Sequence, residues 1–208
     1  MGRYTGPSCR LCRREGMKLF LKGDRCHMAK CAVEIGRSVP GMHGRPPRKM
    51  SEYGLQLHEK QRLRHHYGMR EGQFRVFFER ALQRKGVTGE MLLQSLELRL
   101  DNLVFRLGFA ASRRAARQFV LHKHVSVNDR RANVPSMVLK PGAVIKVKGD
   151  QRSQAFARKA LESTAKRTVS PWLTMDQEQL KGEVLRVPTR TEIDPFVNEQ
   201  LVVELYSR

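Results

Sequence analysis

The sequence predicts an α+β fold in which an N-terminal segment and a helical domain accompany a small helix-turn-helix-like module, with a C-terminal segment packing back. Three observations predict it. Leucines and phenylalanines recur every three or four residues between residues 74 and 107, which indicates amphipathic helices. Short runs rich in valine and isoleucine lie between turn-forming residues after residue 124, which indicates strands. Four cysteines gather in two close pairs near the N-terminus, which indicates a metal-stabilised segment.

Residues 1–50 are predicted to form a zinc knuckle and a basic extended linker. Cys9 and Cys12 enclose two residues, and thirteen residues further on Cys26 and Cys31 enclose four. Two such pairs can occupy the corners of a tetrahedral zinc site. Other readings stay open: an iron–sulfur cluster also takes four thiolates, His27 can replace Cys26, and four buried cysteines can exist without metal. Since apolar residues are sparse here, we expect metal to supply most of the stability.

Residues 51–90 are predicted to form a helical domain that residues 151–208 complete. EYGLQLHEKQRLRHHYG, residues 52–68, reads as one helix that ends near Gly68. QFRVFFERALQRKG, residues 73–86, places Phe74, Phe77 and Phe78 on one helical face. At this spacing, we expect the three rings to form core rather than to stack on bases.

Residues 91–150 are predicted to form the small module. Residues 91–108 read as one leucine-rich helix, and Ser112 is a good N-cap for a second helix that runs to residue 124. Three short strands follow in the segments VSVN, RRANV and AVIKVK. Beyond the module we expect a helix over 154–167 and a final strand over 198–206.

Positive charge dominates the first two thirds of the chain. Forty Lys and Arg against twenty Asp and Glu give a formal net charge of +20, which indicates a polyanionic partner. The net charge falls from +11 in residues 1–75 to +7 in residues 76–140 and +2 in residues 141–208. No apolar run approaches the roughly 18 residues of a membrane span, and the N-terminus lacks the apolar stretch of a secretory signal. We therefore expect a cytoplasmic protein without membrane contact.

The predicted helix over 112–124 carries a basic face. Arg113, Arg114 and Arg117 lie on one side of its helical wheel, opposite Ala116 and Phe119. Residues 110–127 contain no acidic side chain to offset these charges. Guanidinium groups suit phosphate because they donate two parallel hydrogen bonds. With one Trp and four Tyr in the chain, structured RNA read by its shape fits better than a stacked single strand.

The side chains predicted to contact RNA are basic residues from the first two thirds of the chain. They are Arg3, Arg10, Arg13, Arg14, Lys18, Lys22, Arg25, Lys30, Arg45, Arg48, Lys49, Lys60, Arg62, Arg64, Arg113, Arg114, Arg117 and Lys123. No catalytic residue is predicted, because the chain lacks a P-loop, a dinucleotide-binding glycine motif, His-Glu-x-x-His and Gly-x-Ser-x-Gly.

Several long motifs, in order along almost the whole chain, resemble small-subunit ribosomal protein four in its bacterial or organellar form. They are MGRYTGPSCRLCRREG, PGMHG, SEYGLQLHEKQRLRHHYG, KGVTG, LELRLDNLVFRLGFAASRRAARQFVLHKHVSVN, PWL and VNEQLVVELYSR. Lys123 and Asp129 stand where this family commonly has glycine, so we expect a left-handed backbone at both.

The resemblance implies a non-enzymatic component of a cytoplasmic or organellar ribosome. Members of the family bind a multi-helix junction of the small-subunit ribosomal RNA and nucleate subunit assembly. They contact the fifth small-subunit protein, where the interface affects translational accuracy, and they line the messenger RNA entry channel. Members that keep the four cysteines bind zinc.

Two rival functions suit parts of the sequence. A DNA-binding transcription regulator can combine a zinc site with a helix-turn-helix-like unit, although charge spread over several non-repeating segments argues against it. An RNA-modifying enzyme can carry the same small module, although the residues after it contain no recognisable catalytic motif.

Overall fold

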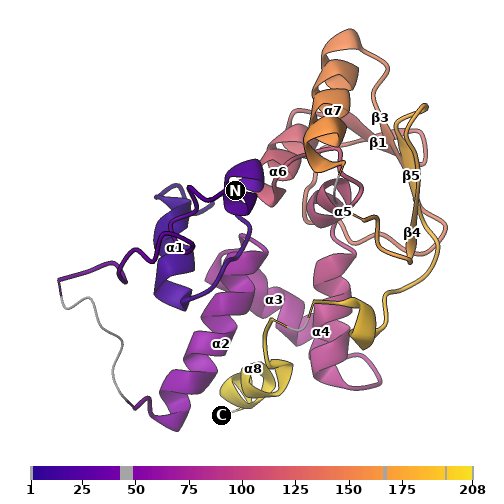
Figure 1. The fold of residues 1–208 in the computed structure, drawn as a ribbon. Helices are drawn as coiled ribbons and strands as arrows, with labels where there is room; N and C mark the ends of the chain where they lie inside the picture. The colour runs from indigo at the N-terminus through magenta and orange to yellow at the C-terminus, as the bar shows by residue number, and fades with distance from the viewer. Residues whose placement is uncertain (1, 43–48, 166–167, 195, 208) are drawn as a thin grey trace. The chain divides into compact units, whose positions relative to one another are not determined.

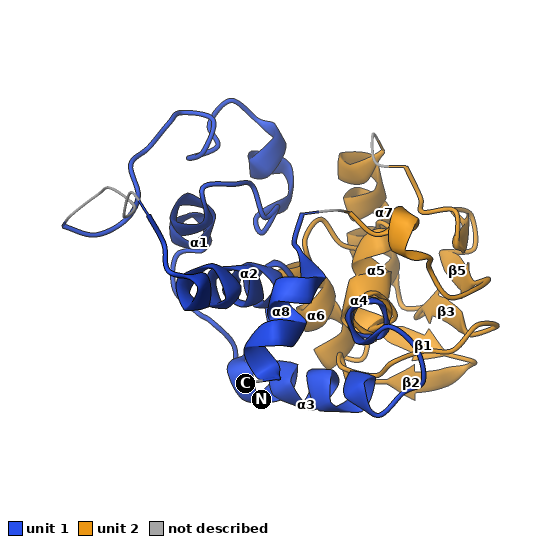
Figure 2. Cartoon of the chain, turned by 90° about the horizontal axis from the view of Figure 1, so that it is seen from below, with its two compact units in different colours: residues 1–92, 195–208 blue, residues 93–194 orange. Residues whose placement is uncertain are grey.

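The computed structural model describes residues 2–42, 49–165, 168–194 and 196–207, and Figure 1 labels most of its helices and strands. The chain divides into two compact units, shown in Figure 2: unit 1 contains residues 1–92 and 195–208, and unit 2 contains residues 93–194. This division differs from the prediction, which gave residues 151–208 to the helical domain. Only the last fourteen residues belong there, because residues 151–194 extend the fold of unit 2.

The elements follow one another in chain order. Unit 1 contains α1 (Ser8–Glu15), the short helix η1 (Gly23–His27), α2 (Glu52–His66), α3 (Glu71–Leu82) and α8 (Glu199–Tyr206). The division between the units falls inside α4 (Thr88–Glu97). Unit 2 contains α5 (Leu100–Arg106), α6 (Arg113–Leu121), β1 (Val125–Val127), β2 (Arg130–Ala132), β3 (Val144–Val147), α7 (Gln151–Thr164), β4 (Leu173–Asp176), β5 (Lys181–Val184) and η2 (Arg190–Glu192).

Aromatic side chains form the core of unit 1. The predicted core face of α3 is confirmed, because Phe74, Phe77 and Phe78 are all buried. From α8, Tyr206 stacks on Phe78 with ring centroids 4.6 Å apart. Burial of such rings is worth about 1.5–3 kcal/mol for each side chain, so α8 is an integral part of this core.

The predicted C-terminal strand is wrong, because residues 199–206 form the helix α8. The side chain of Asn198 accepts a hydrogen bond from the amide of Gln200 at 3.0 Å and caps the helix. The β-branched pair Val202 and Val203 favours a strand locally. Packing of Val202 into the core of unit 1 overrides that preference, because its side chain is fully buried.

A five-stranded antiparallel sheet in the order β2-β1-β3-β5-β4 forms one layer of unit 2. The three predicted strands are β1, β2 and β3, whereas β4 and β5 were not predicted. Asn128 and Asp129 form a type I′-like turn between β1 and β2, with φ values of 48° and 62°, so the left-handed backbone expected at Asp129 is confirmed. Lys123 also has the expected left-handed backbone, with φ 64°.

Gly182 explains how β5 fits the core of unit 2. A Cβ atom at this position would lie 2.5 Å from both methyl carbons of Leu107. Because real Cβ atoms do not come so close, the leucine occupies the space that a side chain would need. β5 therefore lies directly against the end of α5, which attaches residues 173–184 to unit 2.

The single helix predicted over residues 91–108 is instead α4 and α5. At the break, Arg99 forms an isolated antiparallel bridge with Val138. The amide of Leu100 donates to the carbonyl of Met137 at 2.8 Å, and the amide of Leu139 donates to the carbonyl of Leu98 at 2.9 Å. The sequence does not reveal this break, because residues 98–100 are all buried. The leucine pattern of the two helices therefore continues through it.

Candidate nucleic-acid interface

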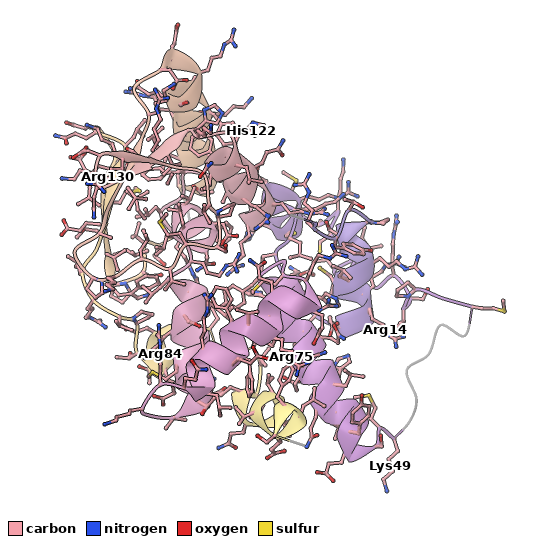
Figure 3. All side chains as sticks on the ribbon, turned by 180° about the vertical axis from the view of Figure 1, so that it is seen from behind. Arg14, Lys49, Arg75, Arg84, His122 and Arg130 are labelled. Carbon is pink, nitrogen blue, oxygen red and sulfur yellow. The ribbon has the colours of Figure 1, made fainter. Side chains whose placement is uncertain are left out.

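The N-terminal segment of unit 1 presents most of its predicted RNA-contacting side chains to solvent. On α1, Arg10 and Arg14 are exposed, whereas Arg13 donates to the carbonyl of Ser38 at 2.8 Å. Lys18 is half-buried and forms an ion pair with Glu34. The remaining exposed candidates are Arg3, Lys22, Arg25, Lys30 and Lys49. Figure 3 shows Arg14 and Lys49 reaching outward, and the predicted contacts Arg45 and Arg48 fall outside the described residues.

A buried carboxylate holds α1 against α2. The side chain of Glu15 is only 2% exposed, and its oxygens lie 3.1 Å from Nδ1 of His65 and 3.3 Å from Nε2 of His58. Nε of Arg62 lies 3.9 Å from the same carboxylate, and Arg62 also pairs with Glu59. Arg62 is therefore engaged inside unit 1, where it offsets a buried negative charge.

Glu71 engages two further predicted contacts, Lys60 and Arg64. Nζ of Lys60 lies 2.8 Å from Glu71, and the hydroxyl of Tyr206 donates to the same carboxylate at 2.7 Å. Nε of Arg64 lies 3.7 Å away. Burial raises the pKa of Glu71, but the bonds from Lys60 and Tyr206 more than reverse this, and the net effect is a lowered pKa. Lys60, which is among the residues predicted to contact RNA, has its side chain buried in this cluster.

The cysteines lie on α1, on η1 and in the turn that follows. Cys12, Cys26 and Cys31 are buried, and Cys9 is half-buried. Burial raises the pKa of Cys12 and Cys26, and the neighbouring cysteines raise it further. Among the residues with a described placement, no group of three or more Cys, His, Asp or Glu is arranged to hold a metal ion. The zinc knuckle therefore stays a prediction.

This cysteine segment has a small apolar core of its own. Leu19, Leu21 and Cys12 are buried together, with Leu11 and Val33 packed against them. Two buried leucines contribute about 3–6 kcal/mol before the entropy of ordering is subtracted. The sequence composition led us to underestimate the stability of this segment, because its apolar residues are few but pack together in the folded structure.

Arg113 and Arg117 are the buried arginines of α6. Its N-cap is confirmed, since the Ser112 hydroxyl accepts from the amide of Ala115 at 3.2 Å. Arg113 and Arg117 are only 8% exposed. The guanidinium of Arg113 lies 4.5 Å from the centre of the Phe105 ring, and that of Arg117 lies 3.4 Å from Asp101. The prediction that all three arginines face solvent is wrong, because α5 supplies the missing acid.

Asn102 links Arg113 to the end of α4. Its side-chain oxygen accepts from Nε of Arg113 at 2.8 Å, and its amide nitrogen donates to the carboxylate and the carbonyl of Glu97 at 2.8 and 2.9 Å. The same carboxylate receives two bonds from Arg106, at 3.0 and 2.9 Å. Because Glu97 and Asn102 are each 1% exposed, this network fixes α5 and α6 without competition from water.

A basic row crosses the sheet of unit 2, and the sequence reasoning missed it. Arg131 lies opposite Ser126, Ser126 opposite Lys146, and Lys146 opposite Lys181. Directly paired residues share one face of a sheet, so three cations lie along one face. Strand alternation in the sequence was the signal that could have revealed the row. Figure 3 shows the neighbouring Arg130 extending outward from unit 2.

The comparisons with known proteins agree over the whole chain. Residues 3–97 match the family described as the ribosomal protein S4/S9 N-terminal domain, and residues 98–145 match the S4 domain. The small ribosomal subunit protein uS4A of Symbiobacterium thermophilum is 54% identical over 208 residues, which is all of both chains. Proteins named uS4 from Heliobacterium modesticaldum and Dictyoglomus turgidum are 52% and 54% identical over the same complete length.

The chain belongs to the uS4 family of ribosomal proteins. This is a family of structural proteins and not of enzymes, so the rival prediction of an RNA-modifying enzyme is wrong. The uS4 assignment also favours a ribosomal role over that of a transcription regulator. None of the helices in the described ranges is long and apolar enough to cross a membrane.

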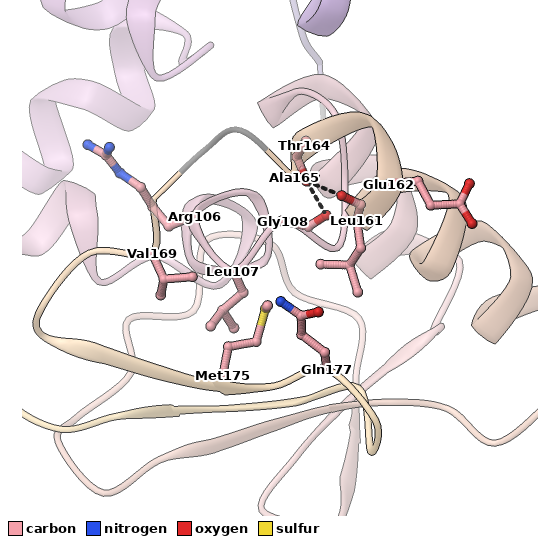
Figure 4. Close-up of a pocket in the computed structure, with 10 residues that line it drawn as sticks. All are labelled: Arg106, Leu107, Gly108, Leu161, Glu162, Thr164, Ala165, Val169, Met175 and Gln177. Carbon is pink, nitrogen blue, oxygen red and sulfur yellow. Dashed lines mark hydrogen bonds between the residues drawn. The ribbon is translucent and has the colours of Figure 1, made fainter.

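Within this uS4 chain, unit 2 continues beyond the S4 domain match. The match ends at residue 145, whereas α7, β4 and β5 complete the sheet and its cover. A pocket of about 260 Å³ lies where α5, α7 and β4 meet, and Figure 4 shows the side chains that line it. There the hydroxyl of Thr164 donates to the carbonyl of Ala160 at 2.9 Å, and the carbonyl oxygens of Gly108 and Leu161 each lie 3.4 Å from the same hydroxyl oxygen. This pocket has a mixed lining, and Arg106 at its rim already pairs with Glu97 and Asp194.

Proposed function

We propose that this protein is a structural constituent of the small ribosomal subunit and binds small-subunit ribosomal RNA directly. The observation that carries the proposal is the full-length identity of more than half to proteins named small ribosomal subunit protein uS4. The net charge of +20 and the exposed arginines and lysines of the N-terminal segment support it, because phosphate contacts dominate the affinity of such complexes.

Filter binding of the full chain to the 5′ domain of small-subunit ribosomal RNA tests this function. We expect tight binding whose affinity falls linearly with salt on logarithmic axes, by about 10³-fold or more between about 50 and 200 mM salt. Duplex DNA of equal length is the competitor. Equal competition by the duplex, or an affinity that salt does not change, would contradict specific ribosomal RNA binding.

We propose further that binding nucleates assembly of the subunit. The support is that both units present basic surface, so that one chain can hold two regions of RNA together. Stepwise reconstitution measures this role: without the protein, later proteins of the 5′ domain should fail to join. Their unchanged incorporation would show that the protein binds without nucleating.

The proposed partners are the fifth small-subunit protein and messenger RNA near its entry channel. An acidic pocket of about 540 Å³ in unit 1, lined by Glu90, Glu199 and Glu204, repels RNA and supports contact with a basic protein. Glu90→Lys should therefore weaken that contact and change stop-codon readthrough in a reporter assay. Glu79→Lys, on the exposed side of α3, is the matched control.

The exposed Lys49 beside the linker supports contact with messenger RNA.

We propose that Cys9, Cys12, Cys26 and Cys31 hold one structural zinc ion. Cys12, Cys26 and Cys31 are buried, and the other three cysteines all lie near enough to Cys12 to raise its pKa. Thiolates are also the donors that structural zinc prefers. Exposed arginines on the same segment offset the charge of four thiolates. Metal analysis of purified protein should give one zinc per chain, and the double variant Cys9→Ser/Cys12→Ser should give none. Iron with visible charge-transfer absorption would favour an iron–sulfur cluster, and metal-free wild-type protein would refute both.

A further inference from the structure

A pocket of about 520 Å³ opens between α6 and α7 in unit 2. It lies in the region that carries Lys123 but outside the residues predicted to contact RNA. Its lining combines aromatic rings with basic side chains: Phe119 and His122 come from α6 and its end, His124 precedes β1, and Arg152 and Phe156 come from α7. The lining contains no acidic side chain.

Three rings in this pocket form a nearly parallel stack. The Phe119 ring stacks on His124 and on Phe156, with centroid distances of 5.0 Å and interplanar angles of 23° in both pairs. Phe119 is 5% exposed, whereas Phe156 is 44% exposed. An exposed ring fixed by an inner ring offers a flat apolar face, and every nucleobase can stack on such a face.

A hydrogen-bond chain orients the histidine of this stack. The Ser153 hydroxyl donates its one hydrogen to the carboxylate of Asp150 at 2.8 Å, and Nδ1 of His124 lies 2.6 Å from the same hydroxyl oxygen. That oxygen must therefore accept a hydrogen from Nδ1. The neutral ring then carries its hydrogen on Nδ1 and its lone pair on Nε2.

The charge around the pocket suits the phosphates that accompany a base. His122, Lys123 and Arg152 are exposed, and Figure 3 shows His122 at the outer surface of unit 2. The nearby carboxylate of Asp150 is committed to the N-cap of α7 and to Lys148, whose Nζ lies 3.3 Å away. A cationic rim beside an aromatic face is the combination that binds single-stranded nucleic acid.

We infer that this pocket binds one unpaired nucleobase of the RNA, stacked on Phe156 with its backbone phosphate at Arg152. The inference rests on the proposed function and adds to it a site of base stacking, which the low aromatic content of the chain did not indicate. The base is held in a bulge or loop, because a paired base does not expose its face.

Variants of the full chain, titrated with the 5′ domain of small-subunit ribosomal RNA, test the pocket. Phe156→Ala should weaken binding about 5- to 150-fold, the range measured when a stacking ring is removed. Phe156→Tyr keeps the ring and should bind within about threefold of wild type. Arg152→Ala should weaken binding more than Arg158→Ala, which removes the same charge from an exposed position of α7 outside the pocket. Fluorescence of the buried Trp172 verifies that each variant is folded.

Ultraviolet crosslinking followed by mass spectrometry identifies the contact directly. We expect a crosslink between residues 119–124 or 152–156 and a nucleotide that chemical probing shows to be unpaired. Normal binding by Phe156→Ala, or equal losses for Arg152→Ala and Arg158→Ala, would overturn the pocket while leaving the proposed function intact. A crosslink to a paired nucleotide, or to a protein in assembled subunits, would also overturn it. Failure of the wild-type protein to bind this RNA would instead refute the proposed function.

Discussion

Replacement of Asn102 by alanine should destabilise unit 2 by about 4–5.5 kcal/mol. The substitution removes three hydrogen bonds, one from Arg113, one to the carboxylate of Glu97 and one to its carbonyl. Bonds to charged groups are worth about 1.5–3 kcal/mol each and neutral ones about 1 kcal/mol. Because Arg106 still donates twice to Glu97, the loss at that carboxylate lies at the lower end of its range. The estimate is a large share of the 5–15 kcal/mol that stabilises a typical domain.

Urea unfolding followed by tryptophan fluorescence measures this change. Trp172 is the only tryptophan and is 1% exposed in the core of unit 2, so its signal reports on that unit. Asn133→Ala is the matched control: residue 133 is exposed, and its loss should cost less than about 0.5 kcal/mol. If Asn102→Ala unfolds within about 1 kcal/mol of wild type with an unchanged denaturant slope, the network does not stabilise the unit as we argue.

Three further perturbations have outcomes that the structure specifies. Gly182→Ala forces a methyl group against Leu107 and should cost about 1–3 kcal/mol of unfolding free energy in the same urea assay. Gly149→Ala is the control and should cost less than about 1 kcal/mol, because no atom lies within 4 Å of the added carbon. Equal effects of the two variants would contradict the close packing of β5. Hydrogen bonds from Ser153 hold the pKa of Asp150 at about 2, below its usual 3.8, so its stabilising charge is present above the usual pKa and is lost as the pH falls through the folded value. Asp150→Asn should therefore flatten the loss of unit 2 stability between about pH 4 and pH 2, and an unchanged pH profile would show that this carboxylate does not contribute. Removal of the proposed zinc ion withdraws about 10–16 kcal/mol of binding energy. Hydrogen exchange should therefore accelerate over residues 8–35 and stay unchanged in unit 2. Unaltered exchange over residues 8–35 after verified metal loss would show that the small core of Leu19 and Leu21 is enough to keep this segment folded.

Most of the correctly predicted helices and caps were predicted from local hydrophobic periodicity and turn chemistry. The α3 core face and the Ser112 cap depend on interactions within a few residues, which a sequence displays directly. The left-handed backbone at Lys123 and Asp129 was expected instead from the glycines that the resembling family commonly has there. The break between α4 and α5 depends on Val138, almost forty residues away. β5, with its sequence KGEV, lacks a strand pattern and is held by pairing with β3.

The candidate site shows the same division between local and distant causes. Net charge correctly indicated an RNA-binding family, but it did not distinguish the exposed Arg14 from the buried Arg117. Counting acids near α6 in the sequence missed Asp101, because that acid lies on a different helix and comes close only in the folded unit. Likewise, the ring stack of Phe119, His124 and Phe156 joins three elements, and no sequence spacing reveals it.

The origin of α8 in the last residues of the chain has a consequence for biosynthesis. Unit 1 needs Val202 and Tyr206 to close its core, yet these residues are translated after the whole of unit 2. At about 5–20 residues per second, unit 2 can complete its sheet while the larger part of unit 1 still waits for its final helix. The exposed surface of Phe78 during that interval is a target for chaperones, and premature termination before residue 198 would release a chain with one finished unit and one that cannot close.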